Sequence, residues 1–424
     1  MTISALNFVL ASKKSEITSL QQMLQMGKLV GAVSQLIHVL QRERGTANIY
    51  LCSQGQYFAE QLGERALQVQ LAEQGLMAQL SALDLSGQYI TNASRLFSCI
   101  ATVLHGLTTL PELRQQVAAR TIEQPAAMDR YCQVIRSHLS LVFEAADTSA
   151  DPAIARALLA MFSFMQGKEL AGQERALAAA GFAARYFDEP LQQQLVALID
   201  GQDRCFHTFT EFADARCMAL WQQQQSVDSS EFERFRRVAC TRVTPGSEPN
   251  DVALRWFAVT TARIDGMKQV EDLLEDMVME CCQMRLAQAE KAQQLQQLDI
   301  ALIDLQMPQQ SSRYAVFISE PAGQPNHDHY QTDGLSPQLS RSILDLVEQQ
   351  SRQLQALDAE LVGLRASLVE RKQVEQAKGL LMQHRGLSEQ QAHKTLRDMA
   401  MNQNKKLAEI AAAMLSVADL LSGK

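Results

Sequence analysis

The sequence "LVGAVSQLIHVLQRERGTANIYL", residues 29–51, places its apolar residues at the spacing of a helix. Val33, Leu36 and Leu40 fall near one face of that helix. Similar patterns recur between glycine and proline breaks as far as residue 300, and strand signals are scarce. We therefore expect residues 1–300 to form an all-α domain of about eight long helices in two antiparallel bundles.

The composition narrows the class of protein further. The chain has 424 residues, of which 46% are hydrophobic and only 6% aromatic, so it has enough apolar residues for more than one helical core. No uninterrupted apolar stretch approaches the roughly 20 residues of a membrane span. The eight cysteines form no CxxC pair and no metal-type spacing with histidine. We expect a cytoplasmic protein with reduced thiols, no membrane segment, no metal and no cofactor.

The composition changes after the helical region. Four of the ten prolines lie between residues 307 and 338, so we interpret residues 301–340 as a Pro/Gln/Ser-rich linker. Residues 341–369 then carry apolar residues at heptad positions, most regularly from Leu354 to Leu368. This pattern predicts a coiled-coil helix through which two chains form a homodimer. The alternative is one long helix that packs on its own domain.

The motif "LIDLQMP", residues 302–308, resembles the phosphoacceptor strand of a response-regulator receiver, with Asp304 in the acceptor position. A receiver requires alternating strands and helices before that strand. The preceding residues here are helical in pattern and rich in glutamine. We therefore do not expect phosphorylation at Asp304.

The last part of the chain, residues 370–424, predicts three short helices with one shared core. The core positions follow helical spacing and are Val374, Ala377, Leu381, Ala392, Leu396, Met399, Leu407, Ile410, Ala411, Met414 and Leu415. Such a segment is too small to bury many charges as well. We therefore expect its polar side chains to form an exposed surface.

That surface is basic, whereas the rest of the chain is acidic. Residues 351–424 contain 11 Lys and Arg against 8 Asp and Glu, a balance of +3, and the totals of 39 and 47 leave −11 for residues 1–350. The candidate contacts to a polyanion are Lys378, Arg385, His393, Lys394, Arg397, Lys405 and Lys406. The alternative is an ordinary solvated face.

The segments "ERKxVExAKGLLM", "SExxAHKxLRxMAM" and "KKLAEIA" together resemble an ANTAR domain. The resemblance covers about fifty residues and includes Ala377, Lys378, Leu396 and Arg397. It implies a three-helix RNA-binding module that extends from a coiled coil. It also implies that two small hairpins of a leader mRNA are bound so that a transcription terminator cannot form.

The N-terminal domain shows no phosphate-binding loop and no protease or hydrolase motif, so we expect no catalytic site. It does contain arginines in apolar helical context. Arg44 and Arg175 each follow a glutamate in a segment rich in small residues, as if two helices supplied equivalent groups to one site. For any single arginine, the simpler interpretation is a pair with a neighbouring glutamate, or an aliphatic stem that lies on the surface.

The segments "ERG", residues 43–45, and "KELAGQERA", residues 168–176, resemble the NIT domain, an all-helical sensor of nitrate and nitrite. The resemblance spans residues from about 30 to 290. It implies that Arg44 and Arg175 contact the anion. Arg236 is a third candidate, and the adjacent Arg237 is the alternative to it.

The chemistry of arginine suits this ligand. A guanidinium is planar and permanently charged, and it donates two parallel hydrogen bonds to a pair of oxygens such as those of nitrate. An anion between two arginines would remove their repulsion and change the helix arrangement. The combined resemblance implies a nitrate-responsive antiterminator of an assimilation operon. The alternatives are an antiterminator controlled by a partner protein or by another small ligand, and an enzyme with an unfamiliar helical site.

Overall fold

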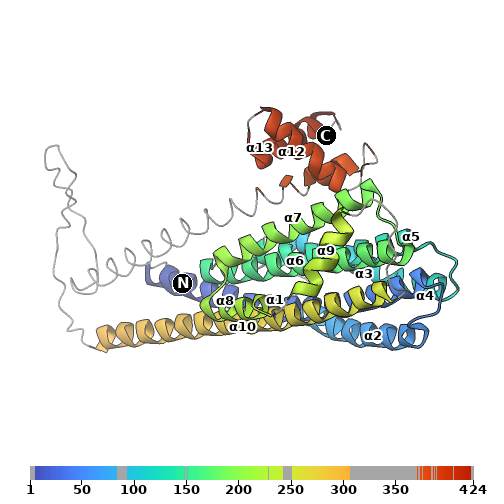
Figure 1. The fold of residues 1–424 in the computed structure, drawn as a ribbon. Helices are drawn as coiled ribbons and strands as arrows, with labels where there is room; N and C mark the ends of the chain where they lie inside the picture. The colour runs from blue at the N-terminus through green and yellow to red at the C-terminus, as the bar shows by residue number, and fades with distance from the viewer. Residues whose placement is uncertain are drawn as a thin grey trace. The chain divides into compact units, whose positions relative to one another are not determined.

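The structure, a computed structural model, describes most of the chain. The described residues are 5–83, 93–147, 149, 151–227, 229–241 and 251–305, followed by 370, 373–374, 376–382, 385, 387, 389–403 and 405–421. No strand occurs among them, and the all-α class predicted from the sequence is confirmed. Figure 1 shows the helices in chain order.

The helices of the N-terminal domain are α1 (Ala5–Cys52), α2 (Ala59–Ser81), α3 (Ala93–Thr108), α4 (Leu110–Ala118), α5 (Gln124–Asp147), α6 (Pro152–Ala184), α7 (Glu189–Phe212), α8 (Ala215–Gln225), α9 (Ser230–Thr241) and α10 (Val252–Leu305). The described residues thus hold ten helices here, where about eight were expected. Three of the ten are short: α4, α8 and α9 have 9, 11 and 12 residues.

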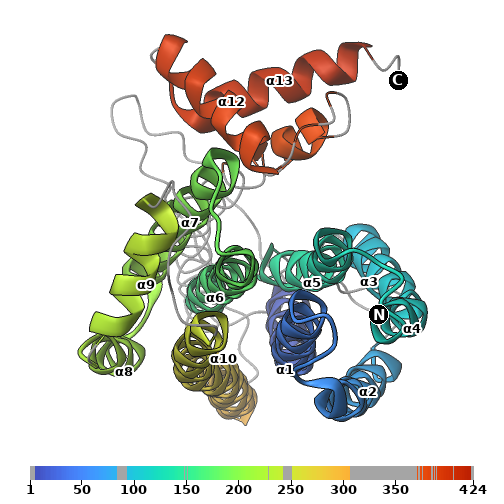
Figure 2. The same cartoon turned by 45° about the vertical axis from the view of Figure 1, so that its right-hand side comes forward.

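Two compact units divide the chain: residues 1–21 with 283–360, and residues 22–282 with 361–424. In the second unit, helices α1 to α5 gather on one side and α6 to α10 on the other (Figure 2). Hydrogen bonds connect α1 with α6 and α6 with α10, so these three helices meet between the two groups. All of the candidate anion ligands except Arg236 lie on α1 and α6.

Aspartates begin three of the helices. Asp151, Asp188 and Asp214 each accept a hydrogen bond from a backbone N–H in the first turn of α6, α7 and α8. These are N-caps, which satisfy donors that a helix start would leave unpaired. Proline follows in the first turn of α6 and of α7, where it needs no N–H partner.

The middle of α1 is buried on nearly all sides. Its apolar residues Leu36, Ile37 and Leu40 are 0% exposed. Polar residues are buried along the same helix, and they recur at helical spacing: Ser34, His38, Gln41, Arg44 and Asn48. Buried polar groups need hydrogen-bond partners, so the helices that pack against α1 must supply partners for these side chains.

The C-terminal module has α12 (Glu389–Gln403) and α13 (Leu407–Leu421), preceded by helical residues 376–382. Every core position expected from the sequence is buried or partly buried in a single apolar cluster of this module. The linker beyond Leu305 and the predicted coiled coil, residues 306–369, lie outside the described residues. Asp304 lies in α10 and not in a strand, against the receiver interpretation.

Two described stretches, Leu10–Cys52 and Ser94–Ala118, are long and apolar enough to cross a membrane by length and composition alone. Two such stretches are weak evidence, because a buried core helix meets the same criteria. In Leu10–Cys52, 72% of the apolar window is buried inside the protein, as expected of a core helix.

Candidate anion site and nucleic-acid interface

Arg44 of α1 is fully buried and forms an ion pair with Glu169 of α6. Its Nη1 and Nη2 each donate to one carboxylate oxygen, and the Nη2–Oε2 distance is 3.1 Å. Burial disfavours the charge of Arg44, but the carboxylate outweighs burial, so the pKa of Arg44 lies above its ordinary value. The protein itself therefore neutralises this arginine.

Glu169 is bound from several sides. Besides the guanidinium of Arg44, the side-chain amide of Gln41 donates to Oε2 at 2.9 Å, and that of Gln173 donates to Oε1 at 2.8 Å. Both carboxylate oxygens thus have two partners. A buried charge with this many hydrogen bonds has little capacity left for an additional ligand.

Arg175 of α6 is only 2% exposed and has a different environment. Its Nη1 donates to the Thr261 hydroxyl of α10 at 2.9 Å, and its Nη2 donates to the backbone carbonyl of Gln41 at 3.0 Å. In the described part of the chain, no carboxylate lies within ion-pair distance of it. Burial, and then the charge of Arg44, lower the pKa of Arg175 to about 9. Arg175 is a buried cation without a matching negative charge.

Two glycines let the arginines reach the opposite helix. A Cβ atom on Gly172 would lie 2.5 Å from Arg44 Nη2, and one on Gly45 would lie 2.6 Å from Arg175 Nη2. Both distances are shorter than real contacts allow. The small residues expected to permit close helix approach therefore make room for these two guanidinium groups.

The glutamates that precede the arginines bind elsewhere. Glu43 accepts two hydrogen bonds from Arg114, at 2.7 and 2.9 Å, and Glu174 accepts two from Arg236, at 2.8 and 2.9 Å. The local pairs considered from the sequence, Arg44 with Glu43 and Arg175 with Glu174, do not form. Successive residues on a helix point in different directions, which is why neither glutamate reaches its neighbour.

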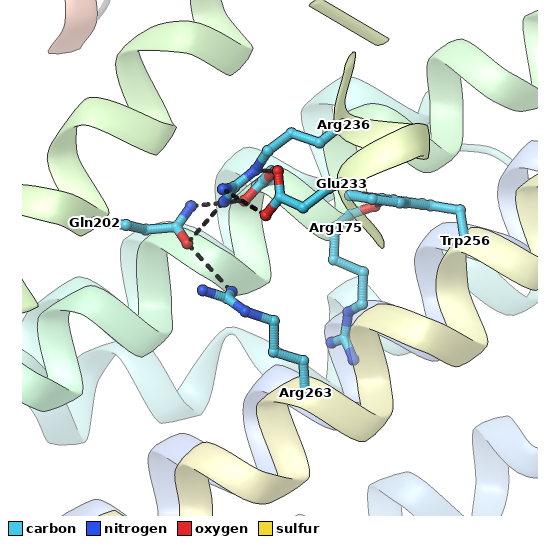
Figure 3. Close-up of polar contacts among 7 residues, drawn as sticks. Arg175, Gln202, Glu233, Arg236, Trp256 and Arg263 are labelled. Atoms are coloured by element: carbon cyan, nitrogen blue, oxygen red, sulfur yellow. Dashed lines mark hydrogen bonds and ion pairs between the residues drawn. The ribbon is translucent and has the colours of Figure 1, made fainter. Parts of the chain in front are cut away.

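Arg236 belongs to a separate polar group. Figure 3 shows Arg236, Gln202 and Arg263 converging, while the side chain of Arg175 points away from them. Arg263 Nη1 donates to Gln202 Oε1 at 3.3 Å, and Arg236 Nη2 is 3.4 Å from the same oxygen. Arg236 is partly buried and Arg237 is exposed, so Arg236 is the one that faces the interior.

The structure thus brings two of the three candidate ligands together. Arg44 and Arg175 meet between α1 and α6, whereas Arg236 lies on the other side of Glu174. Sequence reasoning did not identify Gln41, Glu169 or Thr261 as part of this arrangement. The helical spacing of Gln41 and Arg44 was an available signal, since the two residues share a buried face.

In the C-terminal module the candidate RNA contacts differ in exposure. Arg385, Lys394, Arg397, Lys405 and Lys406 are exposed, and His393 is half-buried. Lys378 is buried, with 7% exposure, and follows Ala377 of the apolar cluster in the sequence. Its aliphatic stem therefore contributes to packing, unlike the side chains of the other candidates.

These features define a helical sensor with a buried cationic site, joined to a small basic helical module. A family model for "Nitrate and nitrite sensing", the NIT domain, matches residues 35–279, and one for the ANTAR domain matches residues 363–415. The chain therefore belongs to the nitrate- and nitrite-sensing family and carries an ANTAR domain. This combination is that of a nitrate-responsive regulator of transcription antitermination.

Two known proteins are similar over nearly the whole chain. The nitrate regulatory protein of Klebsiella oxytoca is 38% identical over 398 residues, which cover 94% of this chain and 91% of that protein. The solved structure of the NasR transcription antiterminator is 35% identical with a TM-score of 0.61, and the match covers 98% of this chain and 99% of the other.

Proposed function

We propose that this protein binds nitrate or nitrite beside Arg175 and in response prevents transcription termination of a nitrate-assimilation operon. One observation carries the proposal: in a domain of the nitrate-sensing family, Arg175 is a buried guanidinium to which the described residues supply no carboxylate partner. Ionic groups in an interior are stable only when they are paired. A small monovalent anion supplies the missing charge.

The ligand acts through the helices that it touches. Arg175 already contacts α1 through the Gln41 carbonyl and α10 through Thr261. An anion that binds the remaining N–H groups of Arg175 repositions this side chain and thereby changes the packing of α10 against α6. A ligand shifts a protein only by its different affinity for two states, and a coupling of about 1–3 kcal/mol is typical. The proposed output is the release or ordering of the RNA-binding module.

The RNA is bound by the basic module. Arg385, Lys394, Arg397, Lys405 and Lys406, together with His393, supply phosphate attraction and base-edge donors for hairpins of a leader mRNA. Two such modules are presented together when the chain forms a homodimer through residues 354–368. We place the protein in the cytoplasm, where its transcript is made, and we assign it no catalytic step and no cofactor.

A thermal-shift series on the full chain tests the proposal. Nitrate or nitrite at 100 times its Kd should stabilise the protein by about 2.7 kcal/mol. Chloride and sulfate should have little effect at equal ionic strength, because chloride has no oxygens to accept a pair of hydrogen bonds and sulfate carries two charges, which makes it costly to bury. Equal shifts with all four anions, or none, would contradict the assignment. Leader RNA should bind more tightly with nitrate than without it.

A further inference from the structure

The surroundings of the two arginines repeat along the chain. Arg44 and Arg175 are 131 positions apart (175 − 44), as are Glu43 and Glu174 (174 − 43). Arg44 reaches α6 beside Gly172, and Arg175 reaches α1 at the Gln41 carbonyl. Those two contact positions are again 131 apart (172 − 41). Helices α1 and α6 therefore exchange arginines in the manner of a local two-fold axis.

The repeat extends to the groups around the two glutamates. Glu43 is bound by the Nε and Nη2 of Arg114 and by the Tyr131 hydroxyl at 3.0 Å. Glu174 is bound by the Nε and Nη2 of Arg236 and by the side-chain amide of Gln202 at 2.7 Å. Each glutamate thus has one arginine fork and one neutral donor. The two halves can be compared position by position.

The two halves differ in the groups that surround the arginines. The counterpart of Glu169, 131 positions earlier, is His38, and the counterpart of Gln173 is Arg42. At the positions of α1 equivalent to Glu169 and Gln173, the sequence thus has a histidine and, one turn later, an arginine. The charge of this half is reversed, so it lacks the anion that the other half contains.

His38 has unused hydrogen-bonding capacity. It is 8% exposed, and its buried Nδ1 has no hydrogen-bond partner in the described part of the chain. Burial, and then the charges of Lys168, Lys268, Arg42 and Arg175, lower its pKa to about 2. The ring is therefore neutral, and it lies within the electrostatic reach of four cations.

Arg175 also has N–H groups to spare. A guanidinium carries five, and two of them are used by Thr261 and the Gln41 carbonyl. The Nε of Arg175 is buried and has no partner among the described residues. Three of the five N–H groups, that of Nε among them, are thus left for an anion.

We propose that nitrate binds Arg175 in the place that the Glu169 carboxylate takes on Arg44, with His38 and Arg42 as its further ligands. This inference rests on the proposed function and specifies its site. A carboxylate and nitrate are both planar and present two oxygens to one guanidinium. The geometry of the Arg44–Glu169 ion pair is then the geometry that we propose for nitrate bound to Arg175.

Calorimetric titration of the full chain with nitrate tests the site. His38→Gln and Arg42→Gln should each weaken nitrate binding at least about ten-fold, the effect of losing one charge-assisted hydrogen bond. His38→Glu places a carboxylate at the counterpart of Glu169, and it should abolish nitrate binding while the far-ultraviolet spectrum stays helical. His138→Gln is the matched control, since His138 is another buried histidine, with 0% exposure, but lies on α5.

The outcomes separate the site from the function. If the unsubstituted protein binds nitrate and both His38→Gln and Arg42→Gln bind it equally well, the anion lies elsewhere and this inference is wrong. The same conclusion follows if His138→Gln weakens binding as much as His38→Gln does. If the unsubstituted protein binds no nitrate, the proposed function itself fails. Should His38→Glu not fold, Arg42→Gln decides, because Arg42 is only partly buried.

Discussion

Two buried cations lie two turns apart on α6, and only one of them has a carboxylate. Lys168 Nζ is 2.5 Å from Glu271 Oε2, and both side chains are 0% exposed. Glu271 also accepts a hydrogen bond from the Ser34 hydroxyl at 2.5 Å. Among the described residues, Arg175 has a hydroxyl and a carbonyl as hydrogen-bond acceptors and the Phe257 ring 4.9 Å away, but no carboxylate within ion-pair distance. Helix α6 therefore carries Lys168, which a carboxylate of the protein neutralises, and Arg175, whose charge is available to a ligand.

The difference between Lys168 and Arg175 distinguishes a charge that stabilises the fold from a charge that can bind a ligand. Burial raises the pKa of Glu271, but the charges of Lys168 and Lys268 and two hydrogen bonds together outweigh burial and keep that pKa below its ordinary value. Burial lowers the pKa of Lys168, and the charge of Glu271 opposes this effect. At Arg175 burial is opposed by no direct partner, so the pKa falls. A site for an external anion must leave part of its charge uncompensated, and that lowers the stability of the empty protein.

We expect the largest effect from a substitution that breaks the Lys168–Glu271 ion pair. Glu271→Gln leaves Lys168 buried without its carboxylate and should reduce the free energy of unfolding by about 3–5 kcal/mol. Urea denaturation followed by circular dichroism measures it. Glu280→Gln is the control, because Glu280 pairs with Arg216 on the surface, where both side chains are 55% exposed. The control should show no measurable change, and an equal loss in both variants would contradict the interpretation.

A second pair of variants contrasts the two arginines. Arg44→Met strands the buried carboxylate of Glu169 and should cost about 3 kcal/mol or more of unfolding free energy. Arg175→Met removes a cation that has no counter-charge, so stability should stay equal or rise. Denaturation without nitrate measures both. Equal destabilisation by the two substitutions would show that Arg175 is compensated in solution.

The third prediction keeps the charge and changes the geometry. Arg175→Lys retains a cation but loses the planar fork, so nitrate affinity should fall ten- to a hundred-fold, or about 1.5–3 kcal/mol. Calorimetric titration measures the loss. Leader RNA binding without nitrate serves as the control and should be unchanged. Nitrate affinity equal to that of the unsubstituted protein would remove Arg175 from the site.

Acid should destabilise the protein through its two buried histidines. The folded pKa values of His38 and His138 are about 2 and about 4, below the ordinary 6.5, chiefly because of burial. The unfolded chain therefore binds more protons below pH 6.5, and stability falls as the pH drops. The loss at pH 5 is roughly 2 kcal/mol for each histidine. His138→Gln should lessen the fall between pH 6.5 and 5, and an unchanged fall would contradict the assignment.

The smallest effect concerns the C-terminal module, where a buried and an exposed cation are again compared. Arg397→Ala should weaken leader RNA binding several-fold and reduce its salt dependence, with no change in the nitrate-induced thermal shift. Lys378→Ala should mainly destabilise the module, since Lys378 is 7% exposed. RNA binding at several salt concentrations, with circular dichroism, distinguishes them. Normal binding by Arg397→Ala would make that side chain dispensable.

The C-terminal module shows how far local pattern alone can be followed. Its core positions, such as Ala377, Leu396 and Ile410, follow from helical spacing, and all of them pack together in the structure. The same pattern could not separate Lys378 from Arg397. Both are basic residues on amphipathic helices, and only the packing of three helices decides which of them is covered.

In the sensor, the sequence by itself determined the helices and the equivalence of Arg44 and Arg175, because periodicity and motif are properties of neighbouring residues. Which carboxylate meets which arginine was decided by the tertiary structure. Arg44 takes Glu169, 125 residues away, and not the adjacent Glu43. Arg175 takes none, although Glu174 precedes it. Charge pairing in a helical core depends on which faces of distant helices meet, and no local spacing encodes that.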